Sequence, residues 1–217
     1  MLLRIPGVYP PQDDTWLLAG TLVEHPLTPL TRVLDICTGT GALALRAAQL
    51  GASCVTAVDI SRRAVLTARL NARIHRHTIR VLQGNLTAPV RDEDFDLVIS
   101  NPPYVPAQDD RLPDTGMAQA WDAGTDGRAL LDRICAQVPD VLAPGGTLLL
   151  AQSALSGADK TQVMLEEQGL QVDVIARQDI PFGPVLTARR HMLTARGIIT
   201  ADQRTEEMVV IRGRQHP

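Results

Sequence analysis

The fold follows most directly from residues 31–50, TRVLDICTGTGALALRAAQL. The largely apolar run 31–36 predicts a buried strand, and residues 42–50 predict a helix. Between them, Gly39 and Gly41 permit a tight turn and a close approach of the backbone to a ligand. A strand, a glycine-rich turn and a helix in this order are typical of the nucleotide-binding unit of α/β proteins.

The rest of the chain continues this alternation of strands and helices. Further strands are predicted at residues 54–59, 79–83, 95–100, 147–152, 172–177 and 208–212. Helices are predicted at residues 61–73, 127–141 and 159–168, and a turn at 144–146. The alternation predicts an α/β fold with a mainly parallel sheet that is covered on both faces. Residues 105–126 and 179–190 fit neither pattern, and we expect long loops there, which are often functional.

The composition is that of an ordinary globular protein, with 217 residues, of which 45% are hydrophobic and 21% are charged. This length predicts a single domain that needs neither disulfides nor a structural metal. The net charge of −3 argues against tight nonspecific binding of nucleic acid. The three cysteines lack the spacing of a zinc site, so no metal is expected. Because the chain shows neither a membrane span nor a signal peptide, we expect it in the cytoplasm.

Two carboxylates flank the glycine-rich turn. Asp59 ends the second predicted strand, 20 residues after Gly39, where an acid can accept hydrogen bonds from both ribose hydroxyls of a nucleotide. Asp35 precedes the glycines, where its charge would repel a pyrophosphate but suits a ligand with an ammonium and a sulfonium. This favours S-adenosylmethionine (SAM) over NAD. The alternative is a purely structural glycine turn.

A second motif, Asn101-Pro102-Pro103-Tyr104, ends the fourth predicted strand. The two prolines stiffen the backbone and remove N–H groups, so that hydrogen-bond acceptors remain, among them the Asn101 side-chain oxygen. Such a set can hold a planar NH2 group, and the Tyr104 ring can stack on the same plane. The alternative is a simple strand terminator, although ligands of open α/β sheets bind at this edge.

With both motifs in view, the chain resembles the class I SAM-dependent methyltransferases, and within them the HemK family of protein glutamine N5-methyltransferases. Residues 35–41, DICTGTG, are similar to the SAM loop of the family, and residues 101–104 are similar to its substrate motif. Residues 8–18 and 120–128 resemble the short branch of the family found in eukaryotes and archaea. The resemblance implies a Rossmann-like, doubly wound sheet of seven strands, mostly parallel with an antiparallel last pair.

The resemblance also implies roles for individual residues. Asn101, Pro102 and Tyr104 are expected to be catalytic, and together with Pro103 to bind the substrate. The cofactor is expected to contact Thr15, Asp35, Thr38, Gly39, Gly41, Asp59, Ile60, Asn85 and Asn101. We expect residues 1–30 to form an N-terminal segment that packs near the cofactor site, and residues 31–217 to form the methyltransferase domain.

Three features depart from the family pattern. Only about 30 residues precede the first strand, so we expect the N-terminal helical domain of bacterial relatives to be absent. Asn85 stands where the family often has an acid near the adenine, and its side-chain oxygen can accept from the adenine amino group. Cys37 stands where a glycine is common, and we interpret it as a small buried residue rather than a reactive thiol.

The expected substrate is a glutamine side chain in a protein, in the Gly-Gly-Gln loop of a peptide chain release factor. A small zinc-containing activator protein is a possible partner, as in the eukaryotic branch. Two alternatives with catalytic activity are an adenine N6-methyltransferase, which uses the same motif on an exocyclic NH2 group, and a protein lysine methyltransferase. A third alternative is a noncatalytic module that binds SAM or NAD. The short acidic chain shows no basic face or target-recognition domain, which argues against the adenine enzyme.

Overall fold

The computed structural model describes residues 2–216 and contains one seven-stranded sheet. The strands are β1 (Arg32–Ile36), β2 (Cys54–Asp59), β3 (Ile79–Gln83), β4 (Phe95–Ser100), β5 (Leu142–Ser153), β6 (Gln171–Pro181) and β7 (Thr205–Arg214). Their order is β3-β2-β1-β4-β5-β7-β6, and β7 runs antiparallel to both β5 and β6 while the other pairs are parallel. The predicted fold class, with its antiparallel last pair, is confirmed.

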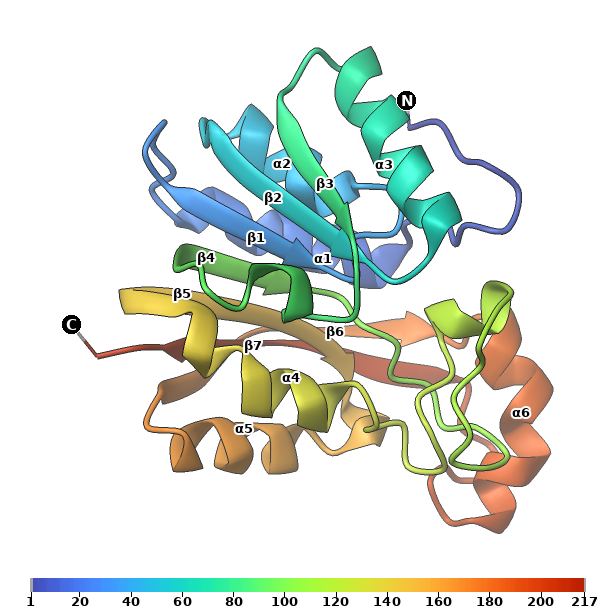
Figure 1. The fold of residues 1–217 in the computed structure, drawn as a ribbon. Coiled ribbons are helices and arrows are strands. Elements are labelled where there is room, and N and C mark those ends of the chain that lie inside the picture. The colour runs from blue at the N-terminus through green and yellow to red at the C-terminus, as the bar shows by residue number, and fades with distance from the viewer. Residues whose placement is uncertain (1, 217) are drawn as a thin grey trace.

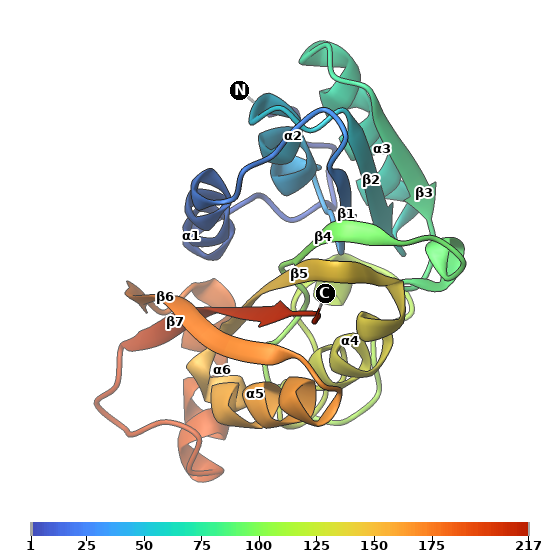
Figure 2. The ribbon, with the colours of Figure 1, turned by 90° about the vertical axis from the view of Figure 1, so that its left-hand side faces the viewer.

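Helices cover both faces of the sheet (Figure 1). One face carries α1 (Asp13–Thr21), α2 (Ala42–Gln49) and α3 (Arg62–Ile74), and the other carries α4 (Leu131–Gln137) and α5 (Ala158–Glu167). Figure 2, turned by 90°, shows the sheet twisting between these two layers. The central strands β1 and β4 are almost wholly buried, as expected for strands covered on both sides. Each face therefore has its own apolar core.

Several predicted elements differ in extent from the observed ones: β6 and β7 extend beyond the predicted 172–177 and 208–212, and two further elements differ more. The helix predicted at 127–141 is wrong at both ends: α4 begins only at Leu131, because Gly127 has a positive φ of +74° and belongs to a turn, and it ends before Pro139. The strand predicted at 147–152 begins earlier, at Leu142. The predicted turn at 144–146 lies within it as a bulge, between the Phe95–Leu142 and Leu97–Thr147 pairs.

The loop predicted at 179–190 is wrong. Strand β6 continues to Pro181, and helix α6 (Pro184–Ala195) follows, with its proline in the first turn where a missing N–H costs nothing. The polar sequence of α6 hid its periodicity, since only Leu186 and Leu193 of the helix are buried. Residues 105–126 are a loop as predicted, apart from one short 3₁₀ turn, and α6 lies beside this loop (Figure 1).

Two arginines, one within α6 and one at its C-cap, hold the long loop in place. Arg189 donates to the carbonyl of Pro106 at 3.0 Å and forms an ion pair with Asp122, and Arg196 donates to the carbonyl of Ala107 at 2.7 Å. Helix α6, which like α1 the sequence pattern did not predict, thus supports the segment that follows the Asn-Pro-Pro-Tyr motif. Within residues 2–216, no helix is both long and apolar enough to span a membrane.

Candidate active site

A cavity of about 630 Å³ lies at the carboxyl ends of the parallel strands. Its walls come from the N-terminal segment, the loop after β1, the ends of β2 to β4, and the start of β7. Most of the residues predicted for the site line it: Thr15, Thr38, Gly39, Asp59, Ile60, Asn85, Asn101, Pro102, Pro103 and Tyr104. Asp35 and Gly41 lie outside this lining.

The glycine-rich loop is shaped by three residues with positive φ. Cys37 has a φ of +61°, which explains why glycine is favoured at this position, while Gly39 and Gly41 have values of +55° and +82°. A Cβ on Gly41 would lie 3.1 Å from that of Ala68 in α3, so this glycine serves helix packing. Burial raises the pKa of the Cys37 thiol, which keeps it protonated.

Asp35 lies outside the cavity lining and ties the glycine-rich loop to the start of α2. Its Oδ2 accepts from the Thr38 hydroxyl at 2.5 Å and from the Ala44 amide at 3.0 Å. The carboxyl group is fully buried, and burial raises its pKa to about 7. Its Oδ1 has no partner, so one buried acceptor remains beside the loop.

Three further residues of the predicted cofactor site, Asp59, Ile60 and Asn85, form one wall of the cavity, whereas Thr15 and Asn101 lie on the opposite wall. Both oxygens of Asp59 accept backbone N–H groups at 2.8 Å, Oδ2 from Gly39 and Oδ1 from Ser61, and burial raises its pKa. Ile60 is 52% exposed and offers an apolar surface to a planar base. The oxygen of Asn85, expected to accept from an adenine, already accepts from Arg133 Nη2 at 2.8 Å.

On the opposite wall, α1 holds the Asn-Pro-Pro-Tyr motif. The Asn101 amide donates through Nδ2 to Thr15 Oγ1 at 3.2 Å, and the Tyr104 hydroxyl donates to Asp14 Oδ2 at 2.9 Å. The Asn101 Oδ1 atom is buried and has no partner. The N-cap of α1 is Gln12, and Asp14 lies in the first turn of this helix.

The direction of these hydrogen bonds fixes which end of the Asn101 amide is free. The Thr15 hydroxyl donates its single hydrogen to Asp14 Oδ1 at 3.2 Å, so its oxygen can only accept. Asn101 must therefore turn its NH2 group toward Thr15 and leave Oδ1 as the free acceptor. The arrangement predicts that a ligand at this point presents an N–H donor.

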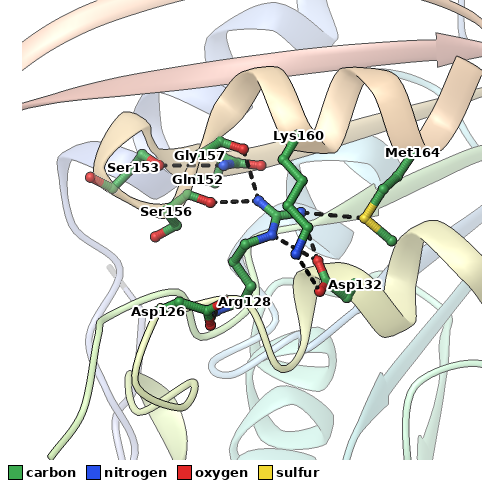
Figure 3. Close-up of polar contacts among 9 residues, drawn as sticks. All are labelled: Asp126, Arg128, Asp132, Gln152, Ser153, Ser156, Gly157, Lys160 and Met164. Carbon is green, nitrogen blue, oxygen red and sulfur yellow. Dashed lines mark hydrogen bonds and ion pairs between the residues drawn. The ribbon is translucent and has the colours of Figure 1, made fainter. Parts of the chain in front are cut away.

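A polar network around Arg128 (Figure 3) includes Ser156, which also holds the carbonyl of Tyr104. Ser156 Oγ donates to this carbonyl at 2.6 Å, and the buried Arg128 donates to the carbonyls of Ser156 at 2.5 Å and Gly157 at 2.8 Å. Arg128 also forms an ion pair with Asp132. Sequence reasoning missed these positions, although Arg128 ends the 120–128 segment whose resemblance to the short branch was a signal.

The fold and the cavity together define a class I SAM-dependent methyltransferase. The cofactor fits the cofactor wall, where Asp59 supplies carboxylate acceptors and Ile60 an apolar surface. The sequence model of the family described as the methyltransferase small domain matches residues 6–179, and the chain belongs to that family. Its relatives confirm the resemblance to the HemK family.

Three relatives illustrate this membership. A protein of Methanocaldococcus jannaschii, provisionally named a protein N5-glutamine methyltransferase, is 36% identical over 82% of this chain and 88% of its own length. A ribosomal protein uL3 glutamine methyltransferase of Bradyrhizobium diazoefficiens is 43% identical over 60% of this chain. A release factor glutamine methyltransferase of Deinococcus radiodurans is 34% identical over 88% of this chain. The chain spans 43% and 66% of the lengths of these two bacterial relatives.

Solved structures show the same fold. The Mtq2–Trm112 complex of E. cuniculi, described as responsible for methylation of the eRF1 termination factor, matches 96% of this chain with a TM-score of 0.67 and 23% identity. A ribosomal protein L11 methylase from Lactobacillus delbrueckii matches 98% of the chain with a TM-score of 0.61. At these identities the likeness concerns the fold alone.

Proposed function

We propose that this enzyme methylates the side-chain amide nitrogen of a glutamine in a protein, in the Gly-Gly-Gln loop of a peptide chain release factor. The observation that carries the proposal is the buried, unpartnered Oδ1 of Asn101 on the cavity wall. A primary amide offers two N–H donors in one plane, and Asn101 Oδ1 can accept one of them while the carbonyl of Pro102 accepts the other. The glutamine specificity in the names of the relatives supports the same substrate.

The residues of the chain position the nucleophile rather than activate it with a strong base. An amide nitrogen is a weak nucleophile because its lone pair is delocalised. SAM supplies an activated methyl group, which even a weak nucleophile can attack when it is well positioned. Accepting both N–H groups at Asn101 and Pro102 orients the nitrogen and stabilises the positive charge that develops on it. The Tyr104 hydroxyl is engaged by Asp14, so its ring is fixed as an apolar wall that excludes water.

The cofactor wall supports the predicted contacts with SAM. Asp59 keeps lone pairs for the ribose hydroxyls beyond its two bonds to the backbone, and Ile60 can cover one face of the adenine. Asn85 can serve the adenine edge together with Arg133, which already binds its oxygen. Thr38 and Gly39 complete this wall, and Asp35 and Gly41 act on it through the loop they support. Thr15 and Asn101 are proposed to contact the cofactor from the opposite wall.

A ribosomal protein is the second candidate substrate, because a uL3 glutamine methyltransferase is among the relatives. A small activator subunit is a further proposal, supported by the two-protein complex of E. cuniculi. The cytoplasmic location and the division into residues 1–30 and 31–217 stay predictions.

The function can be tested with the purified chain and labelled SAM. Separate pools would contain release factor, ribosomal proteins, tRNA and DNA, and mass spectrometry would locate the methyl group. We expect a single methyl on the glutamine of the Gly-Gly-Gln loop. Methylated adenine in DNA, with no methyl on any protein, would contradict the proposal. Turnover by the chain alone would show that it needs no activator.

A further inference from the structure

Glu206 is a buried acid that neither the motifs nor the proposed mechanism uses. It is the second residue of β7, pairs with Ile180 of β6, and is only 5% exposed. It lines the same cavity as Asn101, and its Oε2 atom is buried without a hydrogen-bond partner. The next residue, Glu207, belongs to the opposite face of the strand, where it forms an exposed ion pair with Arg177 at 2.7 Å.

The surroundings of Glu206 are acidic or neutral. A hydrogen bond with Ser153 of β5 lowers its pKa, but burial and the charge of Asp14 in α1 outweigh this bond and raise the pKa to about 7. Burial, then the charge of Asp14 and then that of Glu206 raise the pKa of Tyr9 in the N-terminal segment and of Tyr104 in the loop after β4. Within residues 2–216, Glu206 has no ion-pair partner.

A buried carboxylate oxygen without a donor is costly, so such groups in native proteins normally meet a partner. The position of Glu206 shows which ligand could supply that partner. Asp59 lies at the end of β2, on one side of β4, whereas Glu206 begins β7 on the other side, beyond β5. Glu206 therefore belongs to the wall opposite the cofactor residues, together with Asn101 and Asp14.

We propose that Glu206 is a substrate-binding residue whose free oxygen accepts an N–H donor from the peptide beside the target glutamine. The inference rests on the proposed function, because it assumes a peptide in the cavity. A carboxylate can only accept, and the neighbouring charge of Asp14 favours a positive or strongly polarised donor. The donor is either a main-chain amide or a basic side chain next to the glutamine.

The test compares Glu206→Gln with Glu207→Gln, which removes the same charge from the adjacent residue outside the cavity. Steady-state kinetics would use a Gly-Gly-Gln peptide, and calorimetry would measure SAM affinity. For Glu206→Gln we expect the peptide KM to rise about tenfold, because a charged acceptor becomes a neutral one, with kcat and SAM affinity within about threefold. For Glu207→Gln all three quantities should stay within about twofold.

Two further readouts separate binding from a structural role. Because the ionised form accepts the donor, the peptide KM of the unmodified enzyme should rise as the pH falls below about 7, and Glu206→Gln should lose this dependence. Peptides in which sarcosine replaces a glycine next to the glutamine lack one main-chain N–H. If they bind tenfold more weakly to the unmodified enzyme but not to Glu206→Gln, the donor is a main-chain amide. If only loss of a flanking basic residue has this effect, the donor is a side chain.

The outcomes distinguish the inference from the function beneath it. If the unmodified enzyme methylates no glutamine peptide but methylates another substrate, the proposed function fails and the inference fails with it. If it methylates the peptide and Glu206→Gln leaves the KM and its pH dependence unchanged, only the inference is overturned. Should Glu206→Gln not fold, Glu206→Asp, which keeps the charge but withdraws the oxygen by one methylene, must still raise the peptide KM.

Discussion

The two walls of the cavity differ in how their polar groups are satisfied. On the cofactor wall, both oxygens of Asp59 accept N–H groups of the chain, and the oxygen of Asn85 accepts from Arg133. On the substrate wall, Asn101 Oδ1 and Glu206 Oε2 are buried acceptors without a donor. The side chains that line the cofactor wall are thus paired before any ligand arrives, and its one free buried acceptor, Asp35 Oδ1, lies behind the loop and outside the lining. The free acceptors of the substrate wall line the cavity and can bond to a ligand.

The two walls also differ in how far apart in sequence their partners lie. The bond between Gly39 and Asp59 joins residues 20 positions apart, within one strand-helix-strand unit. The bonds of Thr15 to Asn101 and of Asp14 to Tyr104 join residues 86 and 90 positions apart. A local unit can be recognised from its spacing, while the substrate wall exists only once α1 has packed against the sheet at β5 and β6. The predictions below act on one wall at a time.

The largest effect is expected for Asn101→Ala, which removes the amide acceptor from the substrate wall. Loss of one oriented polar contact in a water-excluded site costs about 10²–10³-fold in kcat. SAM affinity should stay within about threefold, since the cofactor wall is intact. Turnover assays and calorimetry on the same preparation measure both, and near-normal turnover would rule out the proposed role of Asn101.

Asn101→Asp sharpens the same test. It keeps an acceptor oxygen at almost the same volume, but it loses the NH2 group that donates to Thr15 and places a charge near Asp14. Because the amide is anchored in this way, we expect Asp to be about as inactive as Ala. Activity well above the Ala level would show that acceptance alone suffices and that the bond to Thr15 is dispensable.

On the cofactor wall, Asp59→Ala should weaken SAM binding by about 10–150-fold, from the loss of charge-assisted hydrogen bonds to the ribose. Since burial raises its pKa, SAM affinity of the unmodified protein should also fall on acidification earlier than an exposed aspartate would allow. Calorimetry over a pH series measures both effects. Unchanged affinity in a folded Asp59→Ala protein would refute the ribose contact, and tighter binding of NAD than of SAM would overturn the choice of cofactor.

The sequence predicted the fold class and most strands because β1, β2 and β4 are mostly β-branched or apolar, and each has a glycine or proline close to one end. It failed at α6, whose arginines and threonines show little apolar periodicity because the helix buries only Leu186 and Leu193. It also failed to show the bulge in β5, since Pro144-Gly145-Gly146 is an equally good signal for a turn.

For the site, the motifs indicated the residues that now line the cavity, from Thr38 to Tyr104. What no motif could show is which oxygens remain free. Which oxygens are free depends on Thr15 and Asp14, which α1 places beside the motif, and on Glu206, which lies on the last strand. All three are far from either motif in the sequence. Thr15 was expected at the site from the resemblance, but Asp14 and Glu206 carry no local spacing signal, so only the folded chain shows their place in the site.

After the effects at Asn101 and Asp59, a smaller one is expected for Gly127→Ala, which disturbs the backbone that supports the substrate wall. A Cβ on Gly127 would lie 2.3 Å from the carbonyl oxygen of Tyr104, and its φ is +74°. Gly127→Ala should therefore lower the free energy of unfolding by about 3 kcal/mol, from strain and displaced backbone together. Gly169→Ala is the control: its φ is +83° with nothing within 4 Å, so it should cost only about 1–2 kcal/mol. If urea unfolding shows equal losses of the free energy of unfolding for both variants, the contact with Tyr104 contributes nothing to stability.

The smallest effect is expected for Ser156→Ala, which leaves every residue of both walls in place and removes only the hydroxyl that donates to the Tyr104 carbonyl. Since Arg128 binds the main-chain carbonyl of Ser156, that anchor survives the substitution. The lost hydrogen bond should lower the free energy of unfolding by about 1 kcal/mol. The carbonyl belongs to Tyr104, whose ring forms part of the substrate wall, so loss of this bond should loosen the ring. We therefore expect kcat to fall by about threefold to tenfold while SAM affinity is unchanged. An equal loss of SAM affinity would mean that the two walls are mechanically coupled, and that the cofactor wall is not complete by itself.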